Sequence, residues 1–302
     1  MRKNIYRIEE MMKIKTRGRW VLAALAAVLF LGMSGRSFAF TPWSNVNGHW
    51  VSSDGKTTIK GAVEKGVTIT KYQNIAGDIN WKQVVLDDIS FAMVRLGYYD
   101  DPDPYFDENM KGAESVGIKT GVCFYGTAVG VEEAKKEAAY VLDIIKDYKV
   151  SYPVGYDIES PELLNKKLSK QQITEQVNAF CETIEEAGYR VVFFGDNEWL
   201  TRYVEIRKIP YDVWYSRYDF SNNFHNRTIW RCTDRGKVSG IKGSVCLEFS
   251  FEDYDDAFEG TGWRQINGVE YYFEDYRMVK SRATVIDGDI YVFDRNGIGT
   301  LR

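Results

Sequence analysis

The stretch Pro153-Val154-Gly155-Tyr156-Asp157-Ile158-Glu159 joins a short apolar run to two carboxylates that stand two residues apart. The apolar run predicts a buried β-strand over residues 153–158. Residues i and i+2 of a strand point to the same face, so the side chains of Asp157 and Glu159 project together. Two neighbouring carboxylates raise each other's proton affinity, which suits one as a general acid and leaves the other charged.

Similar apolar runs lie on both sides of this stretch, and helical patterns separate them. The other predicted strands of this part cover residues 67–70, 91–96, 120–125 and 190–194. The predicted helices cover residues 81–86, 105–116, 131–147 and 171–187. Each strand–helix unit implies a parallel neighbouring strand and a right-handed crossover.

After Trp199 the rhythm changes, because three further strand candidates follow one another too closely for full helices between them. They cover residues 213–215, 228–232 and 245–249. The sequence therefore predicts an α/β fold over residues 62–252, an irregular TIM-like β/α barrel with five strand–helix units plus three strands. A solvated strand end is the usual explanation of an isolated Asp-x-Glu. Here the pair ends the fourth strand, where the mouth of a barrel carries its active site.

The C-terminal part, residues 262–302, contains an internal repeat. Ile266-Asn267-Gly268 with Tyr271 and Phe273 returns twenty residues later as Ile286-Asp287-Gly288 with Tyr291 and Phe293. Asn-Gly and Asp-Gly between alternating aromatic residues are typical of tight hairpin turns. The sequence therefore predicts a small C-terminal β-hairpin region made of two repeats.

The N-terminal residues 1–39 have the pattern of a secretory signal peptide. Four basic residues between positions 13 and 19 precede the apolar run 21–33, and the small residues Ser37 and Ala39 suit cleavage after Ala39. A membrane anchor is the alternative, but thirteen apolar residues are short for a span, so we expect none after cleavage. Residues 40–61 show no clear period and form an extension without a predicted role.

The charge and the cysteine content limit which partners and cofactors are expected. The whole chain has a net charge of −4, and residues 1–39 hold eight basic and two acidic residues, so the mature chain is at −10. An acidic surface argues against nucleic acid as a partner. Export permits disulfides, and Cys232 and Cys246, in neighbouring strand candidates, are the preferred pair, with buried free thiols as the alternative. With two histidines and no Cys-x-x-Cys, neither a metal site nor another cofactor is predicted.

Eight motifs occur along the chain in the order seen in family-25 lysozymes. They are GVTITKYQ (residues 66–73), FAMVRLGY (91–98), DPYF (103–106), GIKTGVCFY (117–125), DIE (157–159), AGY (187–189), NEWL (197–200) and GKVSGIKGS (236–244). Over roughly residues 62–252 the sequence thus resembles family-25 glycoside hydrolases. The serial order makes this resemblance more specific than any single motif.

The resemblance implies a secreted peptidoglycan hydrolase, a retaining muramidase that cleaves the β-1,4 bond between N-acetylmuramic acid and N-acetylglucosamine. It implies that Glu159 is the general acid and that Asp157 orients the 2-acetamido group, which attacks the anomeric carbon. Further positions are predicted to bind the substrate: Thr68, Tyr72, Arg95, Tyr125, Trp199, Trp214, Arg217, Trp230 and Glu248. The implied partner is peptidoglycan or a related cell-wall glycan, and the oligomeric state is left open.

The sequence departs from the family pattern at several cleft positions. Thr68 and Cys246 stand where the family usually has aspartates, Arg231 and Cys232 where it has Gln and Tyr, and Arg217 where it has Gln. Glu248 is a candidate to replace a missing carboxylate, whereas Arg217 and Arg231 are candidates to pair with the catalytic acids. Two hypotheses follow: a muramidase with attenuated turnover, or a non-catalytic wall-glycan-binding protein on a degenerate lysozyme barrel.

The C-terminal repeats resemble the cell-wall- or choline-binding repeats of Gram-positive surface proteins. The resemblance implies wall contacts by four aromatic residues: Trp263, Tyr271, Tyr272 and Tyr291. The repeat is partial, because Ala283 follows Trp263 at twenty residues and Glu270 stands where such repeats often carry Trp. A structural cap on the barrel is the alternative. We expect a secreted, cell-wall-associated protein of a Gram-positive bacterium.

Overall fold

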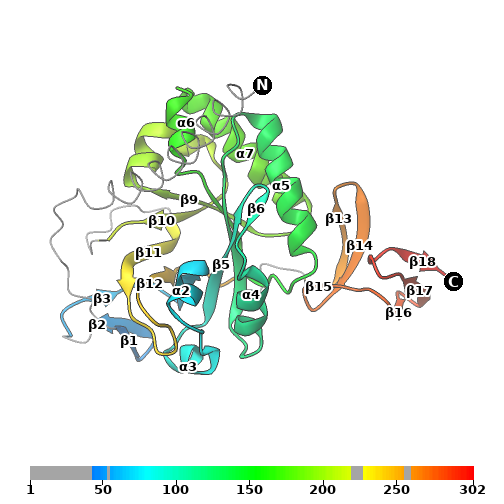
Figure 1. Ribbon diagram of the computed structural model, residues 1–302, viewed down its shortest axis with the longest axis horizontal. Coiled ribbons are helices and arrows are strands. Elements are labelled where there is room, and N and C mark those ends of the chain that lie inside the picture. Colours follow the sequence, from blue (N-terminus) through cyan, green and yellow to red (C-terminus); the bar gives the residue numbers. More distant parts are fainter. Residues whose placement is uncertain (1–42, 53–54, 219–226, 255–259) are drawn as a thin grey trace, which may run out of the picture. The chain divides into compact units, whose positions relative to one another are not determined.

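The computed structural model describes residues 43–52, 55–218, 227–254 and 260–302 (Figure 1). The chain divides into two units, Met1–Phe40 and Thr41–Arg302, and the first lies outside the described residues, as does the predicted signal peptide. None of the helices in the described ranges has the length and apolar character needed to cross a membrane.

Eight strands close into a barrel, in the spatial order β4-β12-β11-β10-β9-β8-β7-β5 with β5 returning to β4 (Figure 1). All neighbours are parallel except β12, which runs antiparallel to both β11 and β4. The predicted barrel is therefore confirmed. The strands are β4 (Glu64–Ile69), β5 (Phe91–Tyr98), β7 (Lys119–Tyr125), β8 (Val154–Asp157), β9 (Val191–Asp196), β10 (Asp212–Ser216), β11 (Arg227–Gly236) and β12 (Val245–Ser250), and β6 (Asp101–Pro102) folds back on the end of β5.

Helices follow the first strands of the barrel. They are α2 (Lys71–Ala76), α3 (Trp81–Leu86), α4 (Phe106–Glu114), α5 (Val131–Ile145), α6 (Pro161–Asn165) and α7 (Lys170–Glu186). Helix α7 begins with a capping box between Ser169 and Gln172 and buries the apolar face that includes Ile173 and Phe180. The fifth unit differs from the prediction, because β9 is followed only by the π-helix η1 (Trp199–Tyr203) and the 3₁₀ turn η2 (Ile206–Lys208).

The barrel interior is filled by large aromatic side chains from several strands. Phe91 stacks on Tyr152 with ring centroids 4.3 Å apart, and both side chains are fully buried. Two glycines make room for this layer. A Cβ atom at Gly155 would lie 2.9 Å from the ring of Trp214, and one at Gly66 would lie 2.4 Å from the ring of Phe91. The barrel is therefore a packed core, and a ligand has access only at its ends.

The extension at residues 40–61, for which the sequence predicts no structure, forms a three-stranded antiparallel sheet in its described part. Its strands are β1 (Trp43–Val46), β2 (His49–Ser52) and β3 (Thr58–Ile59). Trp43 and Trp50 are buried, and each ring lies 5.7 Å from the ring of Phe249 on β12. The sheet thus covers an apolar part of the outer surface of the barrel.

The C-terminal residues form two small antiparallel sheets, drawn in orange and red in Figure 1. The first contains β13 (Gly262–Ile266), β14 (Val269–Glu274) and β15 (Arg277–Met278), and the second β16 (Ala283–Ile286), β17 (Asp289–Phe293) and β18 (Gly299–Leu301). Their turns have positive φ at both central residues, 51° and 77° at Asn267-Gly268 and 53° and 93° at Asp287-Gly288. Asn, Asp and Gly tolerate this conformation, which explains why the turns fall there.

Candidate active site

The two carboxylates of the Asp-x-Glu motif lie at the C-terminal end of β8. Asp157 ends the strand, and its Oδ1 accepts a hydrogen bond of 3.0 Å from the backbone N–H of Glu159. The backbone N–H of Gly126 donates to the carbonyl oxygen of Asp157 at 2.7 Å, which holds the end of β7 beside it. Both side chains are half-buried, so they remain within reach of a ligand at this end of the barrel.

Glu159 is held at two points. Its Oε1 accepts a hydrogen bond of 2.7 Å from the backbone N–H of Asp196 on β9, and its carbonyl oxygen accepts one of 2.7 Å from the hydroxyl of Tyr125 on β7. Burial raises the pKa of Glu159 well above that of an ordinary glutamate, and the negative charges of Asp157 and Asp196 raise it further. A carboxyl group in this state keeps its proton near neutral pH, as a general acid requires.

Asp157 titrates together with Glu159. Burial raises its pKa, whereas the hydrogen bond from the Glu159 amide and the charges of Arg231 and Arg95 offset part of that increase. The shift at Glu159 is the larger of the two. The two carboxyl groups therefore differ in proton affinity, and Glu159 holds its proton more tightly than Asp157.

Asp196 is a site residue that the sequence reasoning missed. It ends β9, next to β8, and its Oδ1 accepts a hydrogen bond of 2.8 Å from the backbone N–H of Trp199. A signal was present in the sequence, because Asp196 follows the predicted strand 190–194 closely and so falls at the same end of the barrel as Asp157.

Below the mouth, a buried polar network links the four strands β4, β10, β11 and β12. Glu248 is fully buried, and its Oε1 accepts hydrogen bonds from the Thr68 hydroxyl at 2.6 Å and from Arg231 Nε at 2.9 Å. Its Oε2 accepts one from Trp214 Nε1 at 2.8 Å, and Arg231 Nη2 donates to the Thr68 hydroxyl oxygen at 2.9 Å. Glu248 and Arg231 thus neutralise each other.

Four of the predicted substrate-binding residues, all on barrel strands, are buried and offer little surface to a ligand. Trp214 and Glu248 have no exposed surface, Trp230 is 3% exposed and Thr68 is 5% exposed. Strand alternation turns Thr68, Trp214 and Glu248 into the barrel interior, where packing and the buried network use them. Trp230 donates from Nε1 to the carbonyl oxygen of Arg217 at 2.9 Å instead of facing a ligand.

Other predicted residues line the rim of the mouth. Tyr72, in the first turn of α2, is 62% exposed. Arg95 is half-buried on the ring of Tyr98, with 4.7 Å between the guanidinium carbon and the ring centroid, and Tyr98 contacts Tyr125 edge to face at 5.0 Å. Arg217 is half-buried just after β10, whereas Trp199 is only 7% exposed.

The expected disulfide between Cys232 and Cys246 is absent, since both are free cysteines. Cys246 shares a strand face with Glu248, whose carboxylate points into the barrel. Cys232 directly follows Arg231, whose guanidinium also points inward, so the Cys232 side chain points outward. The two sulfur atoms therefore lie on opposite faces of the barrel wall. Both cysteines are free thiols in this structure, Cys232 buried and Cys246 partly exposed.

The aromatic residues of the repeats have unequal exposure. Trp263 is 40% exposed and contacts Tyr272 and Tyr291, each with 5.2 Å between ring centroids. Tyr271 is buried, with the Lys146 ammonium 5.9 Å from its ring, so little of its surface is open to the wall contact predicted for it. Arg264 on β13 is the register partner of Tyr271 on β14 and shares its face of the sheet. Arg264 is buried and lies 4.9 Å from the ring of Tyr189 on the barrel.

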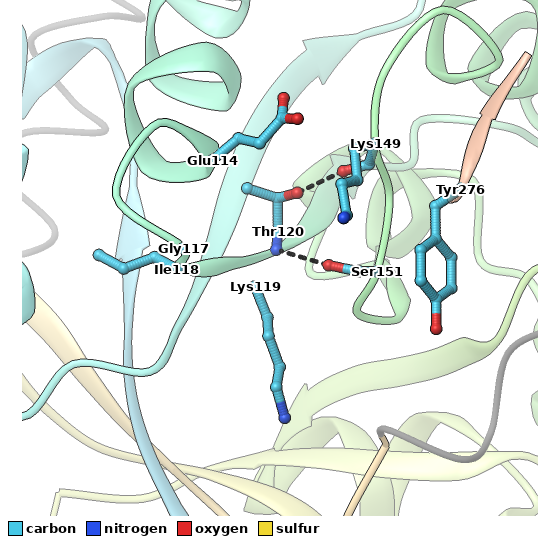
Figure 2. A pocket seen from close by; sticks show the side chains of 8 residues that line it. All are labelled: Glu114, Gly117, Ile118, Lys119, Thr120, Lys149, Ser151 and Tyr276. Atoms are coloured by element: carbon cyan, nitrogen blue, oxygen red, sulfur yellow. Dashed lines mark hydrogen bonds between the residues drawn. The ribbon is translucent and has the colours of Figure 1, made fainter. Parts of the chain in front are cut away.

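A cavity of about 210 Å³ lies at the other end of the barrel, where β7 begins (Figure 2). Figure 2 shows two hydrogen bonds in the wall of this cavity: the Thr120 backbone N–H donates to the Ser151 hydroxyl oxygen, and the Thr120 hydroxyl donates to the Lys149 carbonyl oxygen. Tyr276 of the repeat region lies opposite them. None of the predicted site residues lines it. In the described ranges, no cluster of three or more His, Cys, Asp or Glu residues could hold a metal ion.

A closed β/α barrel with two carboxylates at the end of one strand is an arrangement typical of glycoside hydrolases. The family model of glycosyl hydrolases family 25 matches residues 67–241, more than half of the chain, and the chain belongs to that family. The resemblance found in the motifs is thereby confirmed. The comparison with curated proteins found no match.

Solved structures with the same fold come from several bacteria. The modular autolysin LytC from Streptococcus pneumoniae, in complex with a synthetic peptidoglycan ligand, is 24% identical with a TM-score of 0.60, over 70% of this chain and 52% of that one. A family 25 glycosyl hydrolase from Bacillus anthracis is 18% identical with a TM-score of 0.56, over 71% and 97%. The spore cortex lytic enzyme SleM from Clostridium perfringens is 15% identical with a TM-score of 0.57, over 81% and 97%. The chain spans about half the length of LytC, and at these identities the likeness shows the fold.

Proposed function

We propose that this protein is a secreted peptidoglycan hydrolase, a lysozyme-type muramidase that cleaves the β-1,4 bond between N-acetylmuramic acid and N-acetylglucosamine with retention. Family membership supports glycoside hydrolysis, and the observation that carries the proposal is the state of the acid pair. Glu159 is half-buried with a raised pKa, and it lies beside Asp157 at the open end of the barrel.

In the first step, Glu159 donates its proton to the glycosidic oxygen as the bond from that oxygen to the anomeric carbon breaks. The carbonyl oxygen of the substrate's 2-acetamido group forms a new bond to the same carbon from the opposite face. Asp157 accepts a hydrogen bond from the acetamido N–H and stabilises the positive charge that develops on this group. The product is a cyclic oxazolinium sugar, and Glu159 is left as a carboxylate.

In the second step, the Glu159 carboxylate takes a proton from water, and the water oxygen attacks the anomeric carbon. The bond between that carbon and the acetamido oxygen breaks, which restores the acetamido group and the protonated Glu159. Two inversions give net retention. Both steps use one group as acid and then as base, so the raised pKa of Glu159 serves the whole cycle.

The rival hypothesis, a wall-glycan-binding protein without turnover, would be favoured if arginines neutralised the acid pair. Arg231 instead binds Glu248. Among the described residues, no salt bridge joins Asp157 or Glu159 to an arginine or a lysine. The absence of such a salt bridge among these residues supports the enzyme hypothesis.

The experiment is hydrolysis of purified peptidoglycan by the mature protein, followed by loss of turbidity and release of reducing ends. Glu159→Gln is the matched variant, because it keeps the size of the side chain and removes its proton donor. We expect hydrolysis by the wild type and a loss of at least about 10²-fold in the variant, the lower range for a general acid. Equal inactivity of both proteins, with both still sedimenting with cell walls, would establish the binding hypothesis.

We also infer that the C-terminal repeats contact the cell wall through the exposed edge of Trp263, with Tyr272 and Tyr291 beside it. Three neighbouring aromatic rings support this assignment, since Trp263 is 40% exposed and lies 5.2 Å from both Tyr272 and Tyr291. Trp263→Ala should lower co-sedimentation with walls while hydrolysis of short soluble glycan fragments is retained. Unchanged co-sedimentation would leave the repeats with the role of a cap on the barrel.

A further inference from the structure

We propose that Asp196 is a positioning residue that fixes where the proton of Glu159 sits. It would do so through its backbone amide, which binds one carboxyl oxygen of Glu159, and through its carboxylate, which keeps a negative charge beside that group. The inference rests on the proposed hydrolase function, but its central measurement does not require turnover.

The backbone amide selects one oxygen of Glu159. The N–H of Asp196 donates to Oε1 at 2.7 Å, a short distance for an N–H···O bond. In a protonated carboxyl group, the carbonyl oxygen is the better acceptor, and the hydroxyl oxygen carries the proton. Of the two protonated forms of Glu159, the amide therefore favours the one with its proton on Oε2, the oxygen able to donate to the glycosidic oxygen. The same hydrogen bond by itself lowers the pKa of Glu159, whereas burial and the Asp196 carboxylate raise it.

The side chain of Asp196 fixes the direction of its own amide. Its Oδ1 accepts a 2.8 Å hydrogen bond from the backbone N–H of Trp199, at the start of η1. This bond closes the turn that follows β9. The turn is also tightly packed, because a Cβ atom at Gly195 would lie 3.1 Å from the Leu200 side chain. A peptide plane held in this way has little freedom to turn its N–H away from Glu159.

The charged groups around Glu159 do not cancel the effect of the Asp196 carboxylate on the pKa of Glu159. Asp157 on β8 and Asp196 on β9 contribute negative charge, whereas Arg231 on β11 contributes positive charge. Tyr125 on β7 donates to the Glu159 carbonyl oxygen, and Arg95 on β5 acts on Asp157. Because Arg231 is paired with Glu248, the negative charge of Asp196 is not neutralised by that arginine.

Two substitutions separate the roles of the side chain. Asp196→Asn keeps an oxygen that can accept from the Trp199 amide but removes the negative charge. Asp196→Ala removes both. Glu198→Gln is the matched control, because it removes a carboxylate two residues away that is exposed and paired with Arg202. Circular dichroism establishes that each variant is folded.

The central measurement is the pKa of Glu159 by NMR titration of ¹³C-labelled glutamate carboxyl carbons, with Glu159→Gln assigning the resonance. Asp196→Asn should lower this pKa by about 1 unit, the lower end of the range for the effect of one nearby charge. The alkaline limb of the pH profile for hydrolysis should move down by the same amount, while kcat at its new optimum stays near that of the wild type. Asp196→Ala should in addition lower kcat, by up to about 10²-fold for a misplaced acid.

An unchanged Glu159 pKa in Asp196→Asn would overturn the proposal, as would an equal shift in Glu198→Gln. If no variant and no wild type hydrolyses peptidoglycan, the function proposed above fails. The NMR titration would still decide whether Asp196 acts on Glu159.

Discussion

Arg231 Nε lies 2.9 Å from Glu248 Oε1, and this ion pair occupies the interior of the barrel directly below the mouth. The Glu248 side chain is fully buried, and the Arg231 guanidinium carbon lies 4.4 Å from the ring of Phe194 and 4.7 Å from that of Trp214. Arg231, one of the departures from the family pattern, is therefore compensated in charge by Glu248. Their pairing leaves the carboxylates of Asp157 and Glu159 outside the salt bridge.

This pairing predicts a strong dependence of stability on both partners. Glu248→Gln leaves a buried guanidinium without its carboxylate, and removing one partner of a buried pair costs about 3–5 kcal/mol. Arg231→Met should cost a similar amount because it leaves a buried carboxylate. The double variant should lose clearly less than the sum of the two, since neither charge remains. Urea unfolding monitored by tryptophan fluorescence measures all three, and an additive double variant would contradict the pairing.

Thr68→Asp restores a residue that the family pattern has, and the structure predicts that it destabilises this chain. The Thr68 hydroxyl donates to Glu248 at 2.6 Å in a buried setting, so an aspartate there would place two carboxylates together. We expect a lower midpoint of urea unfolding for Thr68→Asp and recovery when Glu248→Gln is added. Thr68→Val serves as the control for loss of the hydroxyl alone. A Thr68→Asp variant as stable as Thr68→Val would show that the second carboxylate is tolerated.

Much of the fold could be predicted because strand and helix periodicity are local properties. All eight barrel strands overlap the predicted ranges, and the Asp157-x-Glu159 spacing places both carboxylates at one strand end. The burial of Trp214 could not be predicted, because an aromatic residue on a strand fits a sugar-binding surface and a packed interior equally well. The three-stranded sheet at residues 43–59 lacked a signal because its strands are short, and it packs through two tryptophans that are far in sequence from Phe249.

Contacts between residues far apart in the sequence also could not be predicted. The sequence shows that Cys232 and Cys246 lie in adjacent strands, but the face of each side chain depends on register. The ladder between β11 and β12 has irregularities after Arg231 and Thr233, which no local pattern reveals. For the same reason, the pairing of Arg231 with Glu248 was not predicted, and Arg231 was instead a candidate partner of Asp157 or Glu159.

The cysteine geometry predicts four free thiols in the folded protein. Denaturation in the presence of an alkylating reagent, without reductant, should label Cys123, Cys181, Cys232 and Cys246 completely. Under native conditions labelling should be slow, because burial raises the pKa of the Cys246 thiol to about 11 and that of Cys123 to about 12, and the thiolate is the reactive form. A linked peptide containing Cys232 and Cys246 in a non-reduced digest would contradict this arrangement.

The acid pair predicts a bell-shaped pH profile for hydrolysis. Activity should fall at high pH as Glu159 loses its proton and at low pH as Asp157 gains one. Both limbs should lie above the usual range of carboxyl groups, since burial raises both pKa values. The profile of kcat/KM on soluble glycan fragments measures these limbs for the free enzyme. An alkaline limb near the ordinary pKa of glutamate, about 4.3, would contradict the environment described for Glu159.

The same raised pKa has a consequence for stability that does not involve substrate. Because the folded protein holds the Glu159 proton more tightly than the unfolded chain, the stability contribution of this group falls as pH rises from the usual glutamate range through the raised pKa. Glu159→Gln removes the titrating group, so its free energy of unfolding should exceed that of the wild type at pH 8. The difference should disappear near pH 4, where the wild-type side chain is protonated in the folded state. Urea unfolding at both pH values tests this, with the exposed Glu198→Gln as control. If Glu159→Gln were less stable than the wild type at pH 8, the carboxylate would be stabilised by its surroundings, and Glu159 could not keep the proton that the proposed first step requires.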